Sequence, residues 1–288
     1  MMSARSSIFI LAAALGMSAV GCRGVAERPP TPSTSSTSAG TQLAERLNAR
    51  YFDTRTACTN GEAAYHCNGI LVRGTEASES HHAWNPSAHS VANGATAFSY
   101  LRFDVRSRFL FRAQGIIFRP LGMLTPDEYP LILRCIYPKD AGTANEKSPC
   151  TFRKVCVMEG VTTVDAWLEF VNVHLNSCAF TSAPEQFQLS IDVRPSSTQP
   201  HAFNEAIVGT WPQNIPQRLP LEALFYRNDM EGGLEGARFI QRDLLNAMGS
   251  TVPIVAYNPK AEREELPFSY REEDQAVEVT SGGRQPRR

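Results

Sequence analysis

The chain has 288 residues, of which 42% are hydrophobic and 20% are charged, and its formal net charge is −1. This length suits one or two globular domains once targeting and linker segments are set aside. Because the charge is nearly balanced and no run of Lys or Arg occurs, the sequence does not indicate a nucleic-acid-binding protein or a basic membrane-binding patch.

The N-terminus has a pattern typical of export. Arg5 precedes an apolar run from Ser6 to Val20, and small residues lead to Cys22. This order predicts a secretory signal peptide over residues 1–21, and the run is too short for a membrane span of about 20 apolar residues. Ala19-Val20-Gly21-Cys22 resembles a bacterial lipobox, in which Leu is usual where Ala19 stands, but it would also suit an ordinary signal peptidase. We therefore expect an outer-membrane lipoprotein, recognisable by an acyl mass on Cys22, or a secreted protein.

The cysteine count agrees with export. Seven cysteines are present, and an unpaired thiol is unusual in an exported protein. If Cys22 carries the lipid, an even number remains, which in an oxidising compartment predicts three disulfides. Structural zinc is less favoured because no zinc-finger spacing occurs. The sequence leaves the pairing open; we expect each bridge to close a local loop, giving Cys58–Cys67, Cys135–Cys150 and Cys156–Cys178.

The two ends of the chain differ in composition from its middle. Residues 28–40 are rich in Pro, Ser, Thr and Gly, so residues 22–41 are expected to form a lipid-anchored flexible tether. The domain should cover residues 42–260. Residues 261–288 read as a charged C-terminal tail with a frayed end, in which Phe268 and Tyr270 could still pack.

Within the domain, helical and strand patterns alternate irregularly. Such an order favours an α+β fold rather than regular βαβ units. In chain order, the patterns predict a helix over 42–51, strands over 67–73, 96–103, 115–119 and 131–137, a helix over 162–176, a weaker helix over 202–211, a strand over 219–226, a helix over 233–248 with Gly249 as its C-cap, and a strand over 252–257.

Common catalytic signatures are missing from the sequence. There is no Gly-x-Ser-x-Gly, no Gly-x-x-x-x-Gly-Lys, no Gly-x-Gly-x-x-Gly and no His-Glu-x-x-His. His81, His82 and His89 could bind a metal, but no carboxylate completes a ligand set, so a polar loop near Trp84 is the better interpretation. We therefore expect neither a metal nor a cofactor.

Three polar residues stand in apolar strand patterns. Arg73, followed by Gly74, ends the run 70–72 and could hold a diphosphate through its planar fork, or form a surface ion pair. Ser99 could orient a carboxylate, although an ordinary strand serine explains it more simply. Glu222 is isolated in 219–226: buried, it would need a partner, whereas simple alternation could equally place it on a solvated face.

The order of these three residues carries a resemblance. An Arg in one strand, a Ser in a second and a Glu in a later strand resembles the order in ADP-ribosyltransferase folds. Over about residues 43–257, the chain is also similar to the halovibrin family, exported bacterial proteins described as NAD glycohydrolases or ADP-ribosyltransferases. The similar segments are Leu47-Asn48-Ala49-Arg50-Tyr51, Asp53-Thr54-Arg55, 69–75, 98–102, 211–217, 222–226, 241–243 and 252–254.

The resemblance implies an ADP-ribosyltransferase-like split-sheet core that cleaves NAD, as substrate, at the nicotinamide–ribose bond. Glu222 would stabilise the oxocarbenium-like ribosyl transition state, assisted by Ser99, and Arg73 with Gly74 would bind the diphosphate. The remaining implied contacts to NAD are Phe98, Tyr100, Trp211 and Gln241.

Two departures from the family pattern bear on the acceptor and on Ser99. Pro220 stands where arginine-modifying transferases carry Glu or Gln, which favours water as acceptor and leaves a target protein as the second possibility. Ser99 replaces a Ser-Thr-Ser motif, which puts its role in doubt. The alternative is a non-catalytic envelope lipoprotein that binds a protein or glycan, in which Arg73 and Glu222 would not line one cleft.

Overall fold

The structure is a computed structural model that describes residues 38–78, 80–105, 110–137, 184–192, 204–262 and 264–277. The signal peptide, the Cys22 anchor and the helix expected over 162–176 lie outside these ranges and stay predictions. None of the helices within these ranges is both long enough and apolar enough to cross a membrane.

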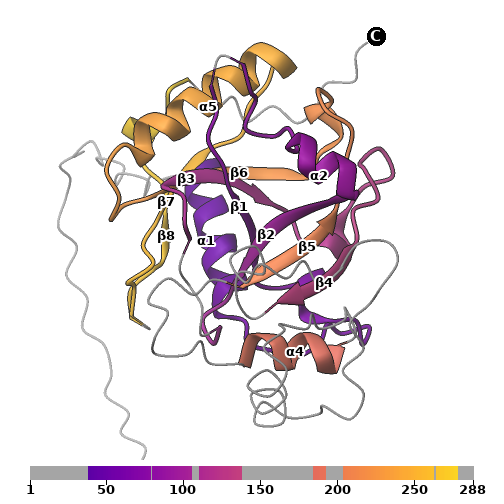
Figure 1. Cartoon of the computed structure of the whole chain (residues 1–288). Helices are drawn as coiled ribbons and strands as arrows, with labels where there is room; N and C mark the ends of the chain where they lie inside the picture. The colour runs from indigo at the N-terminus through magenta and orange to yellow at the C-terminus, as the bar shows by residue number, and fades with distance from the viewer. Residues whose placement is uncertain are drawn as a thin grey trace, which may run out of the picture. The chain divides into compact units, whose positions relative to one another are not determined.

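The described strands form one eight-stranded sheet flanked by helices (Figure 1). Their order across the sheet is β4-β5-β2-β1-β3-β6-β7-β8, and all neighbours are antiparallel except β6 and β7, which helix α5 connects. The mixed α and β class expected from the sequence is therefore confirmed. The strands are β1 (Ile70–Gly74), β2 (Ala95–Leu101), β3 (Gln114–Phe118), β4 (Leu133–Tyr137), β5 (Glu205–Gly209), β6 (Leu221–Arg227), β7 (Ile254–Tyr257) and β8 (Phe268–Ser269). The helices are α1 (Ala39–Phe52), α2 (Ala88–Asn93), α4 (Pro184–Asp192) and α5 (Gly233–Met248), with short 3-10 turns at Ala64–His66, Leu121–Met123, Pro216–Arg218 and Glu272–Asp274.

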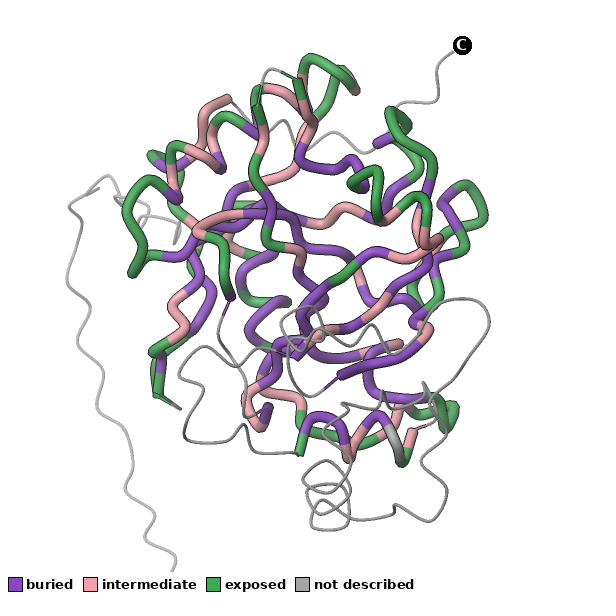
Figure 2. The backbone as a smooth tube through the Cα atoms, viewed as in Figure 1, coloured by how far each residue is buried: buried purple, intermediate pink, exposed green. Residues whose placement is uncertain are grey.

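Alternate residues of the central strands supply two apolar cores, one on each face of the sheet. Leu43, Leu47 and Tyr51 of α1 pack on one face, called here the α1 face, against residues that include Val72, Ile117, Ala223 and Phe225. On the other, the α5 face, helix α5 packs against β6, β3 and β7. Its Ala237, Ile240 and Leu244 belong to a core that also includes Leu71, Phe98, Tyr100, Ile116 and Leu224. Figure 2 shows the buried strands between these two layers. A strand residue therefore belongs to one face or the other, which decides which site residues can meet.

Helix ends follow their capping residues. Helix α5 has the expected bounds and ends at Gly249, whose φ of 72° is the left-handed conformation that glycine favours. Helix α1 begins earlier than expected, because the Ser38 hydroxyl accepts a hydrogen bond from the backbone N–H of Thr41 at 3.2 Å and caps it. The prediction that the tether extends to residue 41 is therefore wrong, and residues 39–41 belong to the domain.

The weaker helix predicted over 202–211 is wrong. Residues Glu205–Gly209 form β5, which pairs with β2 on one side and β4 on the other. Ala206 and Val208 are buried at a spacing of two, which is the period of a strand. Asn204 fixes the position of this strand, because its side-chain amide both donates to and accepts from the backbone of Tyr100 at 2.7 Å.

The C-terminal boundary also differs from the prediction. Residues 264–277 are part of the domain rather than a charged tail from 261. Phe268 is 1% exposed, and its backbone N–H and carbonyl both pair with the side chain of Asn48, at 3.0 and 2.8 Å. Burial of the Phe268 side chain and hydrogen bonding of its backbone favour packing of this segment, although the residues around it are charged.

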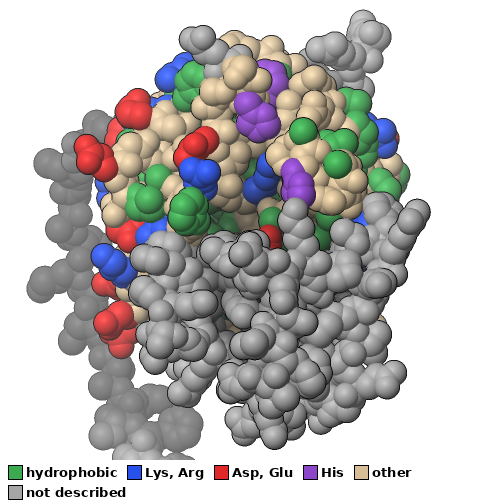
Figure 3. Space-filling model, in the orientation of Figure 1, with side chains coloured by type: hydrophobic (Ala, Val, Ile, Leu, Met, Phe, Trp, Pro, Cys, Tyr) green, Lys and Arg blue, Asp and Glu red, His purple; other side chains and the backbone are tan. Residues whose placement is uncertain are grey.

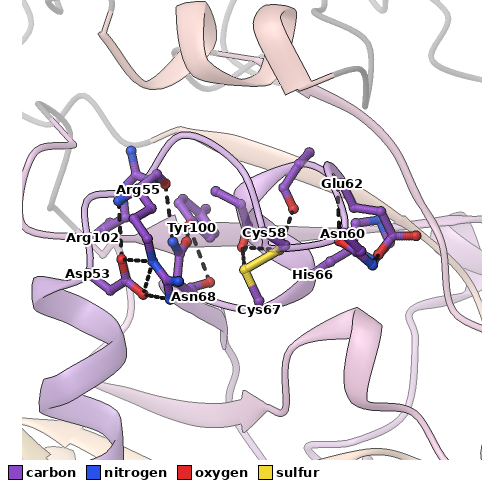
Figure 4. The surroundings of a disulfide bond; sticks show 12 residues. Asp53, Arg55, Cys58, Asn60, Glu62, His66, Cys67, Asn68, Tyr100 and Arg102 are labelled. Atoms are coloured by element: carbon purple, nitrogen blue, oxygen red, sulfur yellow. Dashed lines mark hydrogen bonds and ion pairs between the residues drawn. A yellow bond between two sulfur atoms is a disulfide. The ribbon is translucent and has the colours of Figure 1, made fainter.

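A disulfide closes the connection between α1 and β1. Cys58 and Cys67 are bonded, as predicted, and Figure 4 shows the hydrogen bonds around them. The Asn68 amide donates to the carbonyl of Arg55 at 3.2 Å, and Asn68 accepts from the Tyr100 hydroxyl at 2.9 Å, so the loop is tied to the sheet. Cys135 of β4 is also disulfide-bonded. The cysteines expected in the other bridges, Cys150, Cys156 and Cys178, lie outside the described residues.

Candidate functional site

Glu222 occupies a β-bulge near the start of β6. Ile117 pairs with Ala223, but the next residue, Phe118, pairs with Leu221, so Glu222 is the extra residue between them. A bulge redirects the side chain of its extra residue and is common beside active sites. The Glu222 side chain contacts helix α1 and is only 10% exposed. Of the two interpretations of this residue, the buried one is therefore correct and the solvated one is wrong.

The partner of Glu222 is Arg50, in the last turn of α1. Arg50 Nη2 donates to Glu222 Oε2 at 2.5 Å, and the Arg50 side chain is 14% exposed. Two charges removed from water in this way stabilise each other, and loss of either would leave the other unpaired. The pair joins two segments that carry the family resemblance and lie 172 positions apart. The other carboxylate oxygen of Glu222, Oε1, makes no hydrogen bond with any residue that the structure describes.

A cavity of about 660 Å³ surrounds this pair. It lies where α1 crosses the ends of the strands, and we call it the Glu222 cavity. Leu43, Met123, Leu221 and Pro253 form apolar parts of its wall, while its charged lining residues are Arg46, Arg50, Arg119 and Glu222. This combination of apolar walls with a few convergent charged groups is typical of sites for small ligands.

The charges around the cavity are not balanced. Arg119 forms an ion pair with Glu128, Arg50 pairs with Glu222, and Arg46 makes no ion pair within the described ranges. Among the described residues, three guanidinium groups against two carboxylates leave one positive charge. The cavity is therefore suited to an anion, and Arg side chains bind phosphate and carboxylate oxygens through paired N–H groups.

Arg73 does not share this cavity. It follows Leu71 by two positions and so lies on the α5 face, opposite to Glu222. Its guanidinium donates to the carbonyl of Asn85 at 2.9 Å and lies 5.8 Å from the centre of the Trp211 ring. Burial lowers the pKa of Arg73 to about 10. The expected cleft lined by both Arg73 and Glu222 is thus wrong, because the sheet itself separates them.

Ser99, the serine of the expected strand motif, shares a face with Glu222 but lies on a distant strand. Ser99 pairs in register with Val72, which packs on the α1 face, so Ser99 lies on that face. It is three strands away from β6, or about 14 Å at ordinary strand spacing. Ser99 does not line the Glu222 cavity. The structure therefore does not bring Ser99 together with Glu222.

Three aromatic residues expected to contact NAD belong to the hydrophobic core. Phe98, Tyr100 and Trp211 are each at most 2% exposed. Phe98 packs against Phe118 and Trp211, and the indole N–H of Trp211 donates to the carbonyl of Trp84 at 3.0 Å. Apolar contacts on the α5 face explain their positions, and burial raises the pKa of the Tyr100 hydroxyl.

Gln241 and Gly74 have structural roles. The Gln241 amide donates to Val252 and Gln275, and its oxygen accepts from the backbone of Ala276 at 2.7 Å, so it fastens the C-terminal segment to α5. A side chain at Gly74 would come within 2.9 Å of the Arg112 Cβ, so close packing explains this glycine. Neither residue lines the Glu222 cavity, and their contact with NAD stays a prediction.

The histidines do not form a metal centre among the described residues. No group of three His, Cys, Asp or Glu side chains gathers there. His82 stacks on Trp84 at 4.5 Å and pairs with Asp243 of α5 at 2.8 Å, while His89 contacts Asn93. On the part of the molecular face drawn in Figure 3, basic, acidic and histidine side chains are interspersed.

Sequence reasoning missed Arg46, Arg50 and Arg119. Helical periodicity identified the apolar stripe of α1 but gave no reason to single out the arginines beside it. The one available indication was that Arg50 stands within a segment that resembles the halovibrin family. No protein-family model matches this chain, and no curated protein is significantly similar to it.

Proposed function

We propose that the chain is an exported NAD glycohydrolase of ADP-ribosyltransferase-like fold, with Glu222 and Arg50 at its active site. The observation that carries this proposal is the placement of one desolvated carboxylate in a cavity that otherwise presents three arginines. NAD combines an anionic diphosphate with a ribose at which positive charge develops. The cavity offers groups of the opposite sign to both.

The proposed reaction breaks the bond between the ribose C1′ and the nicotinamide nitrogen. The bonding electrons pass to the nicotinamide ring, which leaves neutral, so no general acid is needed. Positive charge develops on the ribose, and the Glu222 carboxylate stabilises it, as carboxylates do in glycoside hydrolysis. Water then bonds to C1′ and loses a proton, giving ADP-ribose. A target protein remains the second possible acceptor.

Arg50 acts in this scheme as a positioning residue. It binds Oε2 of Glu222 and leaves Oε1 available to the ribose 2-hydroxyl. The same ion pair fixes the orientation of the carboxylate. Arg46 and Arg119 would then provide charge for the diphosphate, in place of the Arg73 expected from the sequence.

The first prediction tests Glu222. Glu222→Gln retains shape and hydrogen bonding but removes the charge, which matters most in the transition state. We expect kcat for nicotinamide release from NAD to fall by about 100-fold or more with KM little changed. The assay uses the purified, oxidised chain with a chelator present. Glu76→Gln, at a surface ion pair with Arg112 outside the cavity, is the matched control and should retain activity.

Arg50 and Arg73 provide a second comparison. Arg50→Lys should lower kcat because the paired carboxylate loses its orientation. Arg73→Lys, on the opposite face, should leave KM for NAD unchanged. If Arg73→Lys raised KM while Arg50→Lys had no effect, the site expected from the sequence would be restored and ours rejected.

A second candidate is a non-catalytic envelope lipoprotein that binds a protein or glycan. It is favoured by the separation of Arg73 from Glu222 and by the ion pair that already occupies Glu222. A folded wild-type chain that releases no nicotinamide, with or without acceptor proteins, would support this function and exclude the glycohydrolase.

A further inference from the structure

A second cavity of about 390 Å³ adjoins the first. Both cavities are lined by Arg119 and Leu221. In addition, Val252 lines the second cavity and the next residue, Pro253, lines the first. The first cavity lies against α1, whereas Met248 places the second at the end of α5. The two cavities therefore meet at the ends of β3, β6 and β7. Arg119 stands at their boundary.

The position of Arg119 is fixed by its backbone and by one ion pair. Its N–H donates to the carbonyl of Pro220 at 2.9 Å, directly before the bulge that contains Glu222. Nη2 pairs with Glu128, which is 3% exposed and also accepts from the backbone of Thr125 at 2.9 Å. The Arg119 side chain is 31% exposed, so N–H groups that no described residue engages remain accessible to an anion.

The second cavity differs in chemistry from the first. Apolar groups of Pro216, Leu219, Met248 and Val252 form much of its wall, with Gln217, Ser250 and Thr251 as polar neighbours. Among the described residues, its ionic lining groups are Arg119 and Glu128, which form one ion pair. A neutral heterocycle with its sugar fits such walls, and both volumes fall within the usual range of about 300–1,000 Å³ for ligand sites.

We propose that one dinucleotide spans both cavities, with its diphosphate on Arg119, its reacting ribose beside Glu222 and its second nucleoside in the second cavity. This inference rests on the proposed function and extends it. It makes the diphosphate and the second nucleoside determinants of affinity, so a mononucleotide with the same scissile bond is a poorer substrate.

The experiment compares NAD with nicotinamide mononucleotide, which contains the same scissile bond but lacks the second nucleoside. Ser250→Trp places bulk in the second cavity at an exposed position. It should raise KM for NAD about tenfold or more and leave the kinetics of the mononucleotide unchanged. Arg119→Lys keeps the charge but loses the planar fork, so it should raise KM for both substrates. Ser269→Trp, exposed on β8, and Arg112→Lys, at a surface ion pair, are matched controls and should change neither.

Binding of ADP-ribose, measured by calorimetry on the same variants, separates this inference from the proposed function. If Ser250→Trp leaves NAD cleavage unaffected, or slows cleavage of NAD and of the mononucleotide equally, the two-cavity site is overturned. The proposed glycohydrolase activity would stand. ADP-ribose binding that Ser250→Trp weakens, without any nicotinamide release, would keep the site and reject the reaction. A folded chain with neither binding nor release would overturn both.

Discussion

Single residues show how far a side chain's role depends on which face of the sheet it lies on. Arg73 and Glu222 are each the only charged residue in an apolar strand pattern, and each could be buried or solvated by sequence alone. The structure buries both, but on opposite faces. A shift of one position moves a side chain to the other face, and nothing in the local pattern indicates the bulge that directs Glu222 toward α1.

His66 provides a pH-dependent test at this scale. Burial lowers the pKa of His66, and nearby Glu62, with its carboxylate 3.8 Å from Nδ1, acts in the opposite direction. At about pH 6.5, the ordinary pKa of histidine, this residue therefore binds a proton more readily in the unfolded chain than in the folded one. Stability is fully present above that pH and falls as the pH drops toward the lower pKa of the folded state.

We predict that His66→Gln flattens the dependence of the unfolding free energy on pH below about 6.5. Glu62→Gln removes the opposing carboxylate and should make the same dependence steeper. Chemical denaturation at a series of pH values measures both. Equal slopes in the wild type and His66→Gln would show that this histidine does not contribute.

At the scale of secondary-structure elements, predictability followed the strength of the local pattern. Helix α5 was predicted with its observed bounds because an amphipathic stripe and a glycine cap agree. The short apolar run of β5 was misassigned, since periodicity cannot distinguish a short buried strand from a helix. Its strand character comes from pairing between β2 and β4, and those contacts are remote in sequence. The cavity was beyond prediction for the same reason, because α1, β6, the residue after β3 and the segment before β7 all contribute to it.

The disulfide-closed loop is the element that we expect to be most sensitive to redox conditions. Cys58 and Cys67 enclose a short loop, and Cys67 lines the Glu222 cavity. Replacing both cysteines by serine should lower the unfolding free energy by about 2–4 kcal/mol, because the unfolded chain regains conformational freedom. Guanidinium unfolding under oxidising conditions measures the change. An unchanged midpoint and slope would show that the loop is held by its hydrogen bonds alone.

At the scale of the whole domain, the C-terminal segment joins the two faces of the sheet. Phe268 packs on the α1 face and is held by Asn48. Asp274 accepts from the Tyr226 hydroxyl at 2.8 Å, and Ala276 donates to Gln241 of α5. The domain was predicted to end at residue 260 because the residues after it are mostly charged, and composition reports only local polarity. The boundary is actually decided by partners about 220 positions away, as for Phe268 and Asn48.

Truncation tests this description of the domain. A chain that ends at Ala261 loses the burial of Phe268, a loss of about 3–5 kcal/mol by analogy with large-to-small core substitutions. It also leaves the Asn48 amide without its partner Phe268 and the Gln241 oxygen without the N–H of Ala276, at about 1–3 kcal/mol each. Together these losses approach the total stability of an ordinary domain, about 5–15 kcal/mol, so we expect no cooperative thermal transition.

A chain that ends at Val277 keeps all these contacts and should unfold like the full chain. Asn48→Ala alone should lower stability by an intermediate amount. A cooperative transition at the full-chain temperature in the Ala261 truncation would show that the domain ends where its composition changes.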